Sequence, residues 1–334
     1  MSRSLRIALT LAISAVFLFL AARGVEWERA WATALQIRAG WLVLVVAFTV
    51  WTLYIRAQRW QVLLRPLGMV ERAPAVHATN IGFFANMVLP LRAGEIVRPV
   101  LLARRTKLPL GGVLASIVLE RVFDLLAVIL LFGAATLLVP VSEQVRQLGV
   151  LLVSFGVLLG GAVGIARWQE QRVISLWEHV AKWLPQIVAE PLDHFVRGFL
   201  RALEVLDRPS RFFEVVVWTA YLWLIIGAVN TFGLVAFGFA VPLLRCGVAL
   251  TAIVALAVSV PSAPGYIGSF QFGCKLALEV FRIDASDALA FSVVLHVTQF
   301  FAILAAGLYS LLREGVSLRQ IEEVSKSDVS VSPG

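Results

Sequence analysis

Charged residues are scarce in this sequence: Asp, Glu, Lys and Arg make up 15% of its 334 residues, whereas hydrophobic residues make up 60%. A soluble globular domain carries about a quarter charged residues. With a mean hydropathy of +0.87, the composition excludes a soluble enzyme, a secreted disulfide scaffold and a disordered chain. We therefore expect an all-α polytopic membrane protein.

Cysteines and catalytic motifs are almost absent as well. The two cysteines, Cys246 and Cys274, both lie in apolar sequence, so no disulfide framework is implied. The sequence has no His-Glu-x-x-His pair, no Gly-x-Ser-x-Gly elbow and no P-loop. We therefore expect no metal, no cofactor and no catalytic residue, and no ATP hydrolysis by this chain to drive transport.

The net charge of +8 would suggest a nucleic-acid partner in a soluble protein. In a membrane protein, Lys and Arg in cytoplasmic loops explain it, so we expect no nucleic acid. If both termini are cytoplasmic and two broken hydrophobic segments return to their own side, basic residues favour the cytoplasmic side by roughly three to one. Full crossings by those segments would weaken this bias. We expect a multi-pass membrane protein with cytoplasmic termini.

Spanning helices need about 20 apolar residues, because the hydrocarbon core is ~30 Å thick and a helix rises ~1.5 Å per residue. The first such segment could also be a signal peptide, but Ala21-Ala22-Arg23 is a poor cleavage site, so we expect a retained helix. We expect about six spanning helices, in residues 7–22, 41–60, 125–142, 147–166, 215–239 and 288–312.

Two further hydrophobic segments, residues 76–100 and 246–281, are interrupted by Pro and Gly, which predicts re-entrant or broken helical hairpins. Each is flanked by spans, which gives a first unit at 41–142 and a second at 212–312. The first hairpin would open to the cytoplasm and the second to the outside. This order indicates a possible inverted repeat within a single transmembrane domain, residues 1–312, with the hairpin tips meeting near the midplane.

Residues 167–211 join the two units. Apolar side chains recur there at helical spacing, punctuated by Pro185 and Pro191, and charged residues occupy the other faces. This pattern predicts amphipathic helices on the cytoplasmic surface, either as a connector or as a binding site. The tail, residues 313–334, is polar and is expected to be cytoplasmic and frayed.

The first candidate site is the tip of the first hairpin, where Pro and Gly break the helix beside Asn86. Arg92, Glu95 and Arg98 follow at i, i+3 and i+6, which would place them on one helical ridge and let Glu95 pair with either arginine. Charge inside a membrane is costly and rarely kept without a partner or a task. We interpret Arg92 and Arg98 as ligands of a lipid phosphate, oriented by Glu95. The alternative is an ordinary cytoplasmic loop.

The second candidate site is the triplet Glu120, Arg121 and Asp124, whose i, i+3 and i+4 spacing permits ion pairs on one helix face. Residues 108–142 could form one helix, which would put all three charges inside the membrane. Alternatively, residues 108–119 lie at the interface and residues 125–142 cross alone. We favour the second arrangement, with the triplet at the cytoplasmic boundary near the first hairpin.

The third candidate site is the uncharged stretch at the tip of the second hairpin. Such a loop must face protein or a wet cavity, because lipid cannot satisfy its amides. Free backbone N–H groups at a broken-helix N-terminus can bind an anion, and neutral side chains would add donors. The alternative is a kink needed only for packing. The residues proposed to line this site are Ser262, Gly265, Gly268, Ser269 and Gln271.

Together, residues 89–98, 120–124 and 262–271 resemble the lysylphosphatidylglycerol synthase transmembrane region family. The family pattern runs approximately Pro-x-Arg-x-Gly-Glu-x-x-Arg, then Glu-Arg-x-x-Asp, then Pro-Gly-Gly-x-Gly-x-x-Glu. Tyr266 stands where the second Gly is usual, and Gln271 where Glu is usual. A proton-coupled or cationic-headgroup role of the second hairpin therefore does not carry over.

The resemblance implies lipid translocation, since the family region flips aminoacylated phosphatidylglycerol when it is fused to a soluble synthase domain. This sequence leaves no room for that domain, so we expect a stand-alone translocator and not an enzyme. Our leading hypothesis is the flipping of an anionic phospholipid or a polyprenyl-phosphate-linked lipid between the hairpins. Arg92, Arg98 and Arg121 would neutralise its phosphate, and the carboxylates of Glu95, Glu120 and Asp124 would hold these arginines in place. The partners would be membrane lipids and a separately encoded lipid-modifying enzyme.

Two other hypotheses stay open at this point. The chain could be an integral-membrane enzyme acting on a lipid-linked substrate, with Glu95 or Asp124 as the base. It could instead be a non-catalytic partner that recruits an enzyme through residues 167–211.

Overall fold

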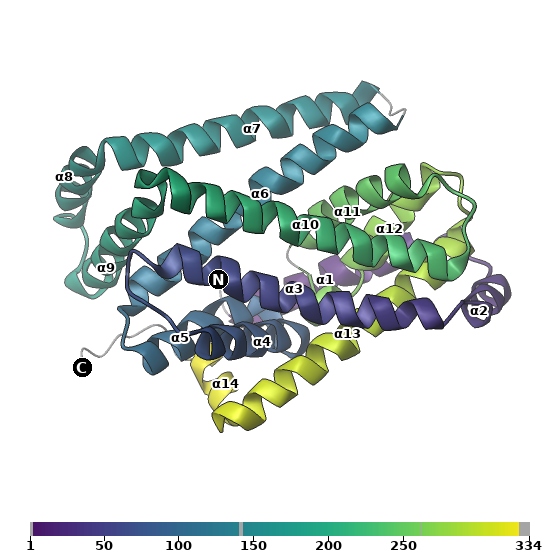
Figure 1. Cartoon of the computed structure of the whole chain (residues 1–334), viewed down its shortest axis with the longest axis horizontal. Helices are drawn as coiled ribbons and strands as arrows, with labels where there is room; N and C mark the ends of the chain where they lie inside the picture. Colours follow the sequence, from purple (N-terminus) through teal and green to yellow (C-terminus); the bar gives the residue numbers. More distant parts are fainter. Residues whose placement is uncertain (1–2, 140–142, 261, 327–334) are drawn as a thin grey trace.

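The computed structural model describes residues 3–139, 143–260 and 262–326, and their regular secondary structure is helical throughout (Figure 1). The long helices are α1 (Arg3–Ala22), α3 (Gly40–Leu64), α6 (Leu110–Leu138), α7 (Glu143–Trp168), α10 (Pro209–Phe237) and α13 (Ala285–Glu314). The shorter helices are α2 (Trp27–Leu35), α4 (Arg72–Val88), α5 (Gly94–Thr106), α8 (Glu170–Ala181), α9 (Gln186–Leu203), α11 (Leu243–Ser259), α12 (Ser269–Glu279) and α14 (Leu318–Lys326). Short 3-10 turns are η1 (Pro90–Arg92), η2 (Glu204–Asp207) and η3 (Pro264–Tyr266).

Several of these helices are long and apolar enough to cross a membrane. In the described part of the chain they are α3, residues Gly149–Trp168 of α7, α10 and α13. Ala8–Ala22 and Trp27–Leu35 would add one more if this pair, bent by 85°, counts as a single broken span. The protein is therefore an all-helical multi-pass membrane protein. The expected six spans remain a prediction, and α2 is a helix that the sequence pattern did not reveal.

Two units of the chain share one order of elements. In each, a long helix is followed by a pair of short helices joined through a 3-10 turn, and then by a second long helix. The first unit is α3, α4–η1–α5 and α6, and the second is α10, α11–η3–α12 and α13. The packing partners of the two units correspond. The first long helices of the units, α3 and α10, pack on each other, and the turns η1 and η3 touch. The first short helix of each unit packs on the last long helix of the other unit: α4 packs on α13, and α11 packs on α6.

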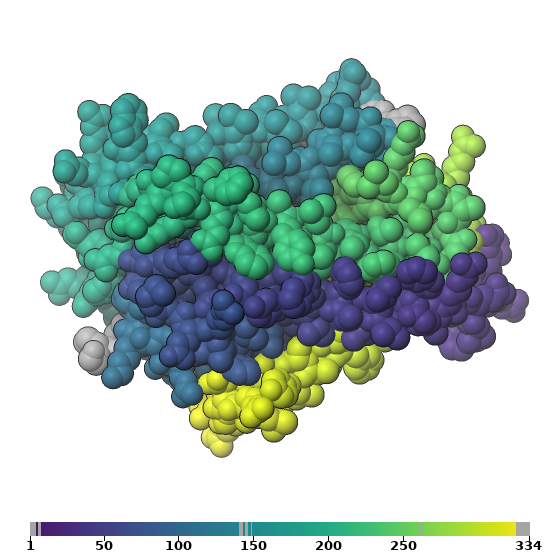
Figure 2. Space-filling model, viewed as in Figure 1, coloured from purple at the N-terminus to yellow at the C-terminus, as the bar shows by residue number. Residues whose placement is uncertain are grey.

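The two units run in opposite directions. Along α3 and α10 the contacts pair Arg65 with Glu214, Arg59 with Thr219 at 3.3 Å, and the rings of Phe48 and Phe232 at 5.0 Å, so the helices are antiparallel. In Figure 1 the hairpin α4–α5 accordingly opens at the end occupied by α8 and α9, and the hairpin α11–α12 opens at the end occupied by α2. Figure 2 shows α3 and α10 side by side across one face of the molecule.

Apolar cores fill the two ends of this arrangement. One core joins the last turn of α3 to the start of α10 and to α9, around Trp60, Val215 and Leu203. Another joins the start of α3 to the end of α10, around Val45 and Leu234. Between these two cores, residues 46–59 of α3 and 216–228 of α10 contribute no buried residue to either core. Polar side chains lie in this middle region.

Helix α6 bears on one expectation. Leu110–Leu138 is one continuous helix, as in the arrangement in which residues 108–142 form a single helix. The position of the charged triplet relative to the membrane interface stays a prediction. Asp124 is the middle residue of this helix, about 20 Å from either end at 1.5 Å per residue. Where the helix passes through the charged triplet, guanidinium groups of α3 and α5 form ion pairs with Glu120 and Asp124.

The break in the first hairpin follows from local chemistry. Pro90 cannot donate a backbone hydrogen bond, and Leu91 and Arg92 adopt positive φ angles of 62° and 54°. The Asn86 side chain then accepts a hydrogen bond from the N–H of Gly94 at 2.8 Å, which joins the two arms of the hairpin. A Cβ at position 94 would meet another backbone oxygen at 1.8 Å, so only glycine permits this close approach.

The second hairpin is broken at Gly265 and Tyr266, with φ angles of 69° and 61°. Gly268 caps α12, because its N–H donates to the Gln271 side chain at 2.8 Å. Helix α1 lies against this tip: a Cβ at Gly268 would meet the Ser14 carbonyl oxygen at 2.6 Å. Lys275 joins α12 to the end of α1 by donating to the carbonyl oxygen of Leu20 at 3.0 Å.

The connector and the tail also differ in part from expectation. The two amphipathic helices are present as α8 and α9, but the inner face of α9 packs closely on α6: a Cβ at Gly198 would meet the backbone N of Gly112 at 2.6 Å. The expected fraying of residues 313–334 is wrong for α14, whose Ile321 and Val324 are buried beside α5. Residues 327–334 of the tail lie outside the described residues.

Candidate functional site

A cavity of about 430 Å³ lies between the two units. Both hairpins and four long helices line it. On α3, α6 and α13 the lining side chains recur at i, i+3, i+4 and i+7, as one helix face requires. Among the lining residues, α3 contributes Thr49, Thr52, Leu53 and Arg56, whereas the hairpin tips contribute Arg92 and Tyr266. We refer to it as the central cavity.

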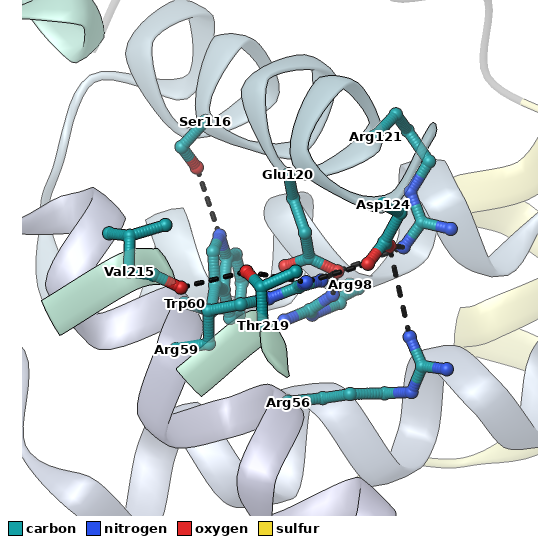
Figure 3. A network of polar contacts seen from close by, with 10 residues as sticks. All are labelled: Arg56, Arg59, Trp60, Arg98, Ser116, Glu120, Arg121, Asp124, Val215 and Thr219. Carbon is teal, nitrogen blue, oxygen red and sulfur yellow. Dashed lines mark hydrogen bonds and ion pairs between the residues drawn. The ribbon is translucent and has the colours of Figure 1, made fainter. Parts of the chain in front are cut away.

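A buried charge cluster forms one wall of the central cavity (Figure 3). Glu120 is fully buried and its Oε1 lies 2.8 Å from Arg121, 3.1 Å from Arg98 and 3.4 Å from Arg59. One carboxylate thus contacts guanidinium groups from α3, α5 and α6. Because Glu120 lies in the interior, these contacts hold the three helices in register.

Asp124 is the second carboxylate of the cluster, one helical turn further along α6. Its Oδ1 accepts a hydrogen bond from Arg59 at 2.6 Å, and its Oδ2 lies 3.4 Å from Arg121 and 4.0 Å from Arg56. Thr219 of α10 also accepts from Arg59, at 3.3 Å. The charge cluster therefore ties the first unit to α10 of the second.

Positive charge exceeds negative charge in the cluster. The guanidinium groups belong to Arg56, Arg59, Arg98 and Arg121, and the carboxylates to Glu120 and Asp124. Several guanidinium nitrogens, including Arg59 Nη2 and Arg98 Nη2, have no hydrogen-bond acceptor among the described residues. Such a surplus is costly in the interior unless an anion offsets it. The six residues of the cluster therefore carry a net positive charge.

The arginines differ in where they face. The Arg98 side chain is 4% exposed, and its guanidinium carbon lies 3.9 Å from the centre of the Trp60 ring, behind Glu120. Trp60 is itself fixed by donating to the Ser116 hydroxyl at 2.9 Å. By contrast, Arg56 and Arg121 line the central cavity, and the Arg121 side chain is 42% exposed. A ligand in the cavity would meet Arg56 and Arg121 before Arg98.

Arg92 links the two hairpins and does not join the charge cluster. Its guanidinium donates to the carbonyl oxygens of Val258 and Val260, where α11 ends, and lies 5.5 Å from the centre of the Tyr266 ring. The predicted ridge of Arg92, Glu95 and Arg98 is therefore wrong, because the positive φ angles at η1 turn Arg92 away from the helix that carries the other two. Glu95 lines the central cavity and forms no ion pair among the described residues.

The side chains of the third predicted site form hydrogen bonds within and beside the second tip. The hydroxyls of Ser262 and Ser269 lie 3.1 Å apart, and Ser269 donates to the Tyr266 carbonyl oxygen at 3.0 Å. Gln271 accepts from Gly268 N and lies 2.9 Å from the His296 ring nitrogen. These side chains hold the second tip together, and anion binding by its backbone N–H groups stays a prediction. Gly265 lies at the tip itself, against the ring of Phe300.

Sequence reasoning missed Arg56, Arg59 and Trp60. They follow the charge-free residues 41–55, so a loop was expected after residue 60, whereas α3 continues to Leu64. Their spacing could have indicated a longer helix, because Arg56 and Arg59 are one helical turn apart and apolar side chains continue before and after them. The described residues contain no group of three His, Cys, Asp or Glu able to hold a metal ion.

Comparisons with known proteins agree with this architecture. Glycosyltransferase AglD of Haloferax volcanii is 26% identical over 301 residues, which cover 81% of this chain and 48% of that protein. The chain thus spans about half the length of this curated relative. The profile described as "Lysylphosphatidylglycerol synthase TM region" matches residues 7–307. Because this match extends over both units and the connector, the chain belongs to the lysylphosphatidylglycerol synthase TM region family.

Proposed function

We propose that the chain binds the phosphate of an anionic membrane lipid in the central cavity and moves the headgroup between the two leaflets. The observation that carries the proposal is the surplus of guanidinium groups on the wall of a cavity enclosed by two oppositely directed hairpins. A family defined by its membrane region, and a relative named as a glycosyltransferase, are consistent with work on lipid-linked molecules.

Phosphate binding would fall to Arg56, Arg121 and Arg92, which line the central cavity. A guanidinium presents a planar pair of donors that matches two phosphate oxygens. Arg59 and Arg98 do not line the cavity; they would hold the carboxylates of Asp124 and Glu120 in place. This assignment keeps Arg92 and Arg121 as ligands and replaces Arg98 by Arg56.

Alternating access would come from the hairpins. Their helices are short: α4 and α11 have 17 residues each, which corresponds to about 26 Å. We propose that both are re-entrant within an inverted repeat, so that rocking of one unit against the other would expose the cavity to each side in turn. The contacts of Arg92 with Val258 and Val260 join the tips and would have to break in each cycle.

The orientation of the chain follows from the positive-inside rule. The end that carries α8, α9 and the opening of the first hairpin holds most of the basic connector residues, so we place it in the cytoplasm of a bacterial inner membrane. Both chain termini would then lie on that side. The lipid partners would be anionic, and an enzyme encoded separately would supply or modify the lipid.

Arg56→Met provides a direct test in proteoliposomes that contain fluorescent phosphatidylglycerol, with dithionite quenching as the readout. Arg56 lies 4.0 Å from Asp124 and 4.9 Å from the centre of the Phe83 ring. Both carboxylates of the cluster keep other guanidinium partners when Arg56 is replaced, so we expect the fold to stay intact. A charge-assisted hydrogen bond contributes about 1.5–3 kcal/mol, so we expect flipping to slow by at least tenfold. Arg197→Met is the matched control, because Arg197 forms an exposed pair on α9.

Three outcomes would contradict the proposal. Unchanged flipping in both Arg56→Met and Arg121→Met would show that these guanidinium groups bind no phosphate. A covalently altered headgroup in the extracted lipids, found by mass spectrometry, would instead indicate an enzyme and would direct attention to Glu95. Loss of function only on changing the exposed face of α8 would indicate a recruiting partner.

A further inference from the structure

His296 is a buried titratable side chain that the proposed function does not use. It lies in the first half of α13, is 9% exposed and lines the central cavity. Its ring stacks on Phe270, with 4.7 Å between the ring centres, and its Nδ1 lies 2.9 Å from Gln271 Nε2. The ring also forms a hydrogen bond with the backbone of Gly265. His296 therefore joins α13 to both sides of the second hairpin tip.

The hydrogen bonds of Gln271 determine which protonation state of His296 fits. The N–H of Gly268 can only donate, and it donates to Gln271 Oε1 at 2.8 Å, which fixes the amide oxygen on the Gly268 side. The amide nitrogen can also only donate, and it therefore faces His296 Nδ1. Because Nδ1 must accept this hydrogen bond, it carries no proton, and the arrangement requires a neutral imidazole.

Protonation of His296 would turn this acceptor into a donor. Both ring nitrogens of an imidazolium carry a proton, so the N–H at Nδ1 would oppose the N–H of the Gln271 amide. The amide could restore a hydrogen bond only by presenting its oxygen to His296, which would leave Gly268 N–H without an acceptor. One amide oxygen thus faces two competing donors, and protonation of His296 would remove the N-terminal cap of α12.

Acidic side chains do not take the place of Gln271. Among the described residues, no carboxylate forms a hydrogen bond or an ion pair with His296. On the helices packed against α13, Arg29, His77 and Lys275 have other partners, which are Asp287, the Ser310 hydroxyl and the Leu20 carbonyl oxygen. The charged and titratable side chains that share the central cavity with His296 are Arg56, Arg92, Glu95, Arg121, Asp124 and Tyr266. Gln271 is therefore the side chain that must respond to a proton on His296.

The tip that Gln271 caps is a junction between the two hairpins and α1. The N–H of Ala263 donates to the Ser14 hydroxyl of α1 at 2.5 Å. A Cβ at Gly265 would lie 3.4 Å from the carbonyl oxygen of Met87 in the first hairpin, and η3 contacts both η1 and α4. Loosening the start of α12 would therefore loosen the contacts of the second tip with its neighbours.

We propose that His296 and Gln271 form a proton-sensitive latch on the second hairpin. Neutral His296 keeps α12 capped, and protonated His296 releases the cap. Protons reach the ring through the central cavity, which His296 lines. This inference goes beyond the proposed function, because the latch belongs to the hairpin whatever the cavity binds. Where the proposed function holds, acid would ease the movement of the second hairpin.

The test is hydrogen–deuterium exchange of the purified full chain in nanodiscs, read by mass spectrometry between about pH 8 and about pH 5, the range in which histidine titrates. Exchange in residues 264–272 is expressed as a protection factor, which removes the intrinsic pH dependence of amide exchange. Exchange in α10 reports that the fold is intact. We expect protection of the tip to fall about fivefold in acid, since an N-cap contributes about that factor to a helix terminus. Unchanged protection would overturn the inference.

Gln271→Glu separates the latch from other effects of acid. A carboxylate accepts from Gly268 N–H and from a protonated His296 at the same time, so we expect this variant to keep its protection across the pH range. His296→Gln removes the titrating group and should also abolish the pH dependence, whereas His77→Gln on α4 should keep the wild-type response. Persistence of the acid-induced loss in Gln271→Glu or His296→Gln would overturn the inference. Because the assay involves no lipid transport, its failure would leave the proposed function intact.

Discussion

Glu120 is the residue whose replacement tests the charge cluster most sharply. It is fully buried and contacts three guanidinium groups at 2.8, 3.1 and 3.4 Å. Glu120→Gln keeps the shape of the side chain but leaves four arginines with Asp124 alone. Breaking a buried ion pair costs about 3–5 kcal/mol, because the remaining charge is left uncompensated. We expect a loss of this size in the free energy of unfolding, measured by titration with dodecyl sulfate in mixed micelles.

The partner in the same ion pair should behave differently. Arg98→Met removes one of the surplus positive charges, so it moves the cluster toward balance, and the main loss is the contact with the Trp60 ring. We expect a cost of about 1–2 kcal/mol, clearly below that of Glu120→Gln. Glu178→Gln, in an exposed pair with Arg197 at 3.1 Å, should cost under about 1 kcal/mol. Equal losses for Glu120→Gln and Arg98→Met would refute the idea that the cluster is overcharged.

Other predictions concern the termini and crossings of helices. Asp284 caps α13 by accepting from Ser286 N at 2.8 Å, and this hydrogen bond holds the pKa of Asp284 below its ordinary value of 3.8. Asp284→Ala should therefore lower the free energy of unfolding by about 1 kcal/mol above pH 3.8. In urea or dodecyl sulfate titrations, the difference in unfolding free energy between wild type and variant should shrink as the pH falls below that value. A difference that grew in acid would contradict the assignment. Gly198→Ala would place a Cβ 2.6 Å from the backbone of Gly112, so we expect a cost of about 1–3 kcal/mol and faster proteolysis of the connector. Gly133→Ala meets nothing within 4 Å and should be neutral or stabilising; equal effects of the two substitutions would show that α9 does not pack on α6.

The sequence by itself determined the class of protein and much of the order of its elements. Apolar runs about as long as a bilayer is thick require helices, because lipid offers no partner for backbone amides. Pro90 and Gly265 mark the two hairpin tips, since they disrupt helical geometry wherever the chain folds. The amphipathic period of residues 167–211 likewise predicts α8 and α9 from local pattern alone.

Only the tertiary structure decided which polar groups face the cavity. Arg59 and Glu120 are distant in sequence and meet because α3 packs on α6, and no local pattern encodes that contact. Ser269 and Gln271 look available in sequence but are used within their own hairpin tip. Hydrogen bonds and ion pairs across helices depend on packing over long sequence separations, whereas helix boundaries depend on neighbouring residues. The elements were therefore legible from the sequence, and the assignment of charges to the site required the fold.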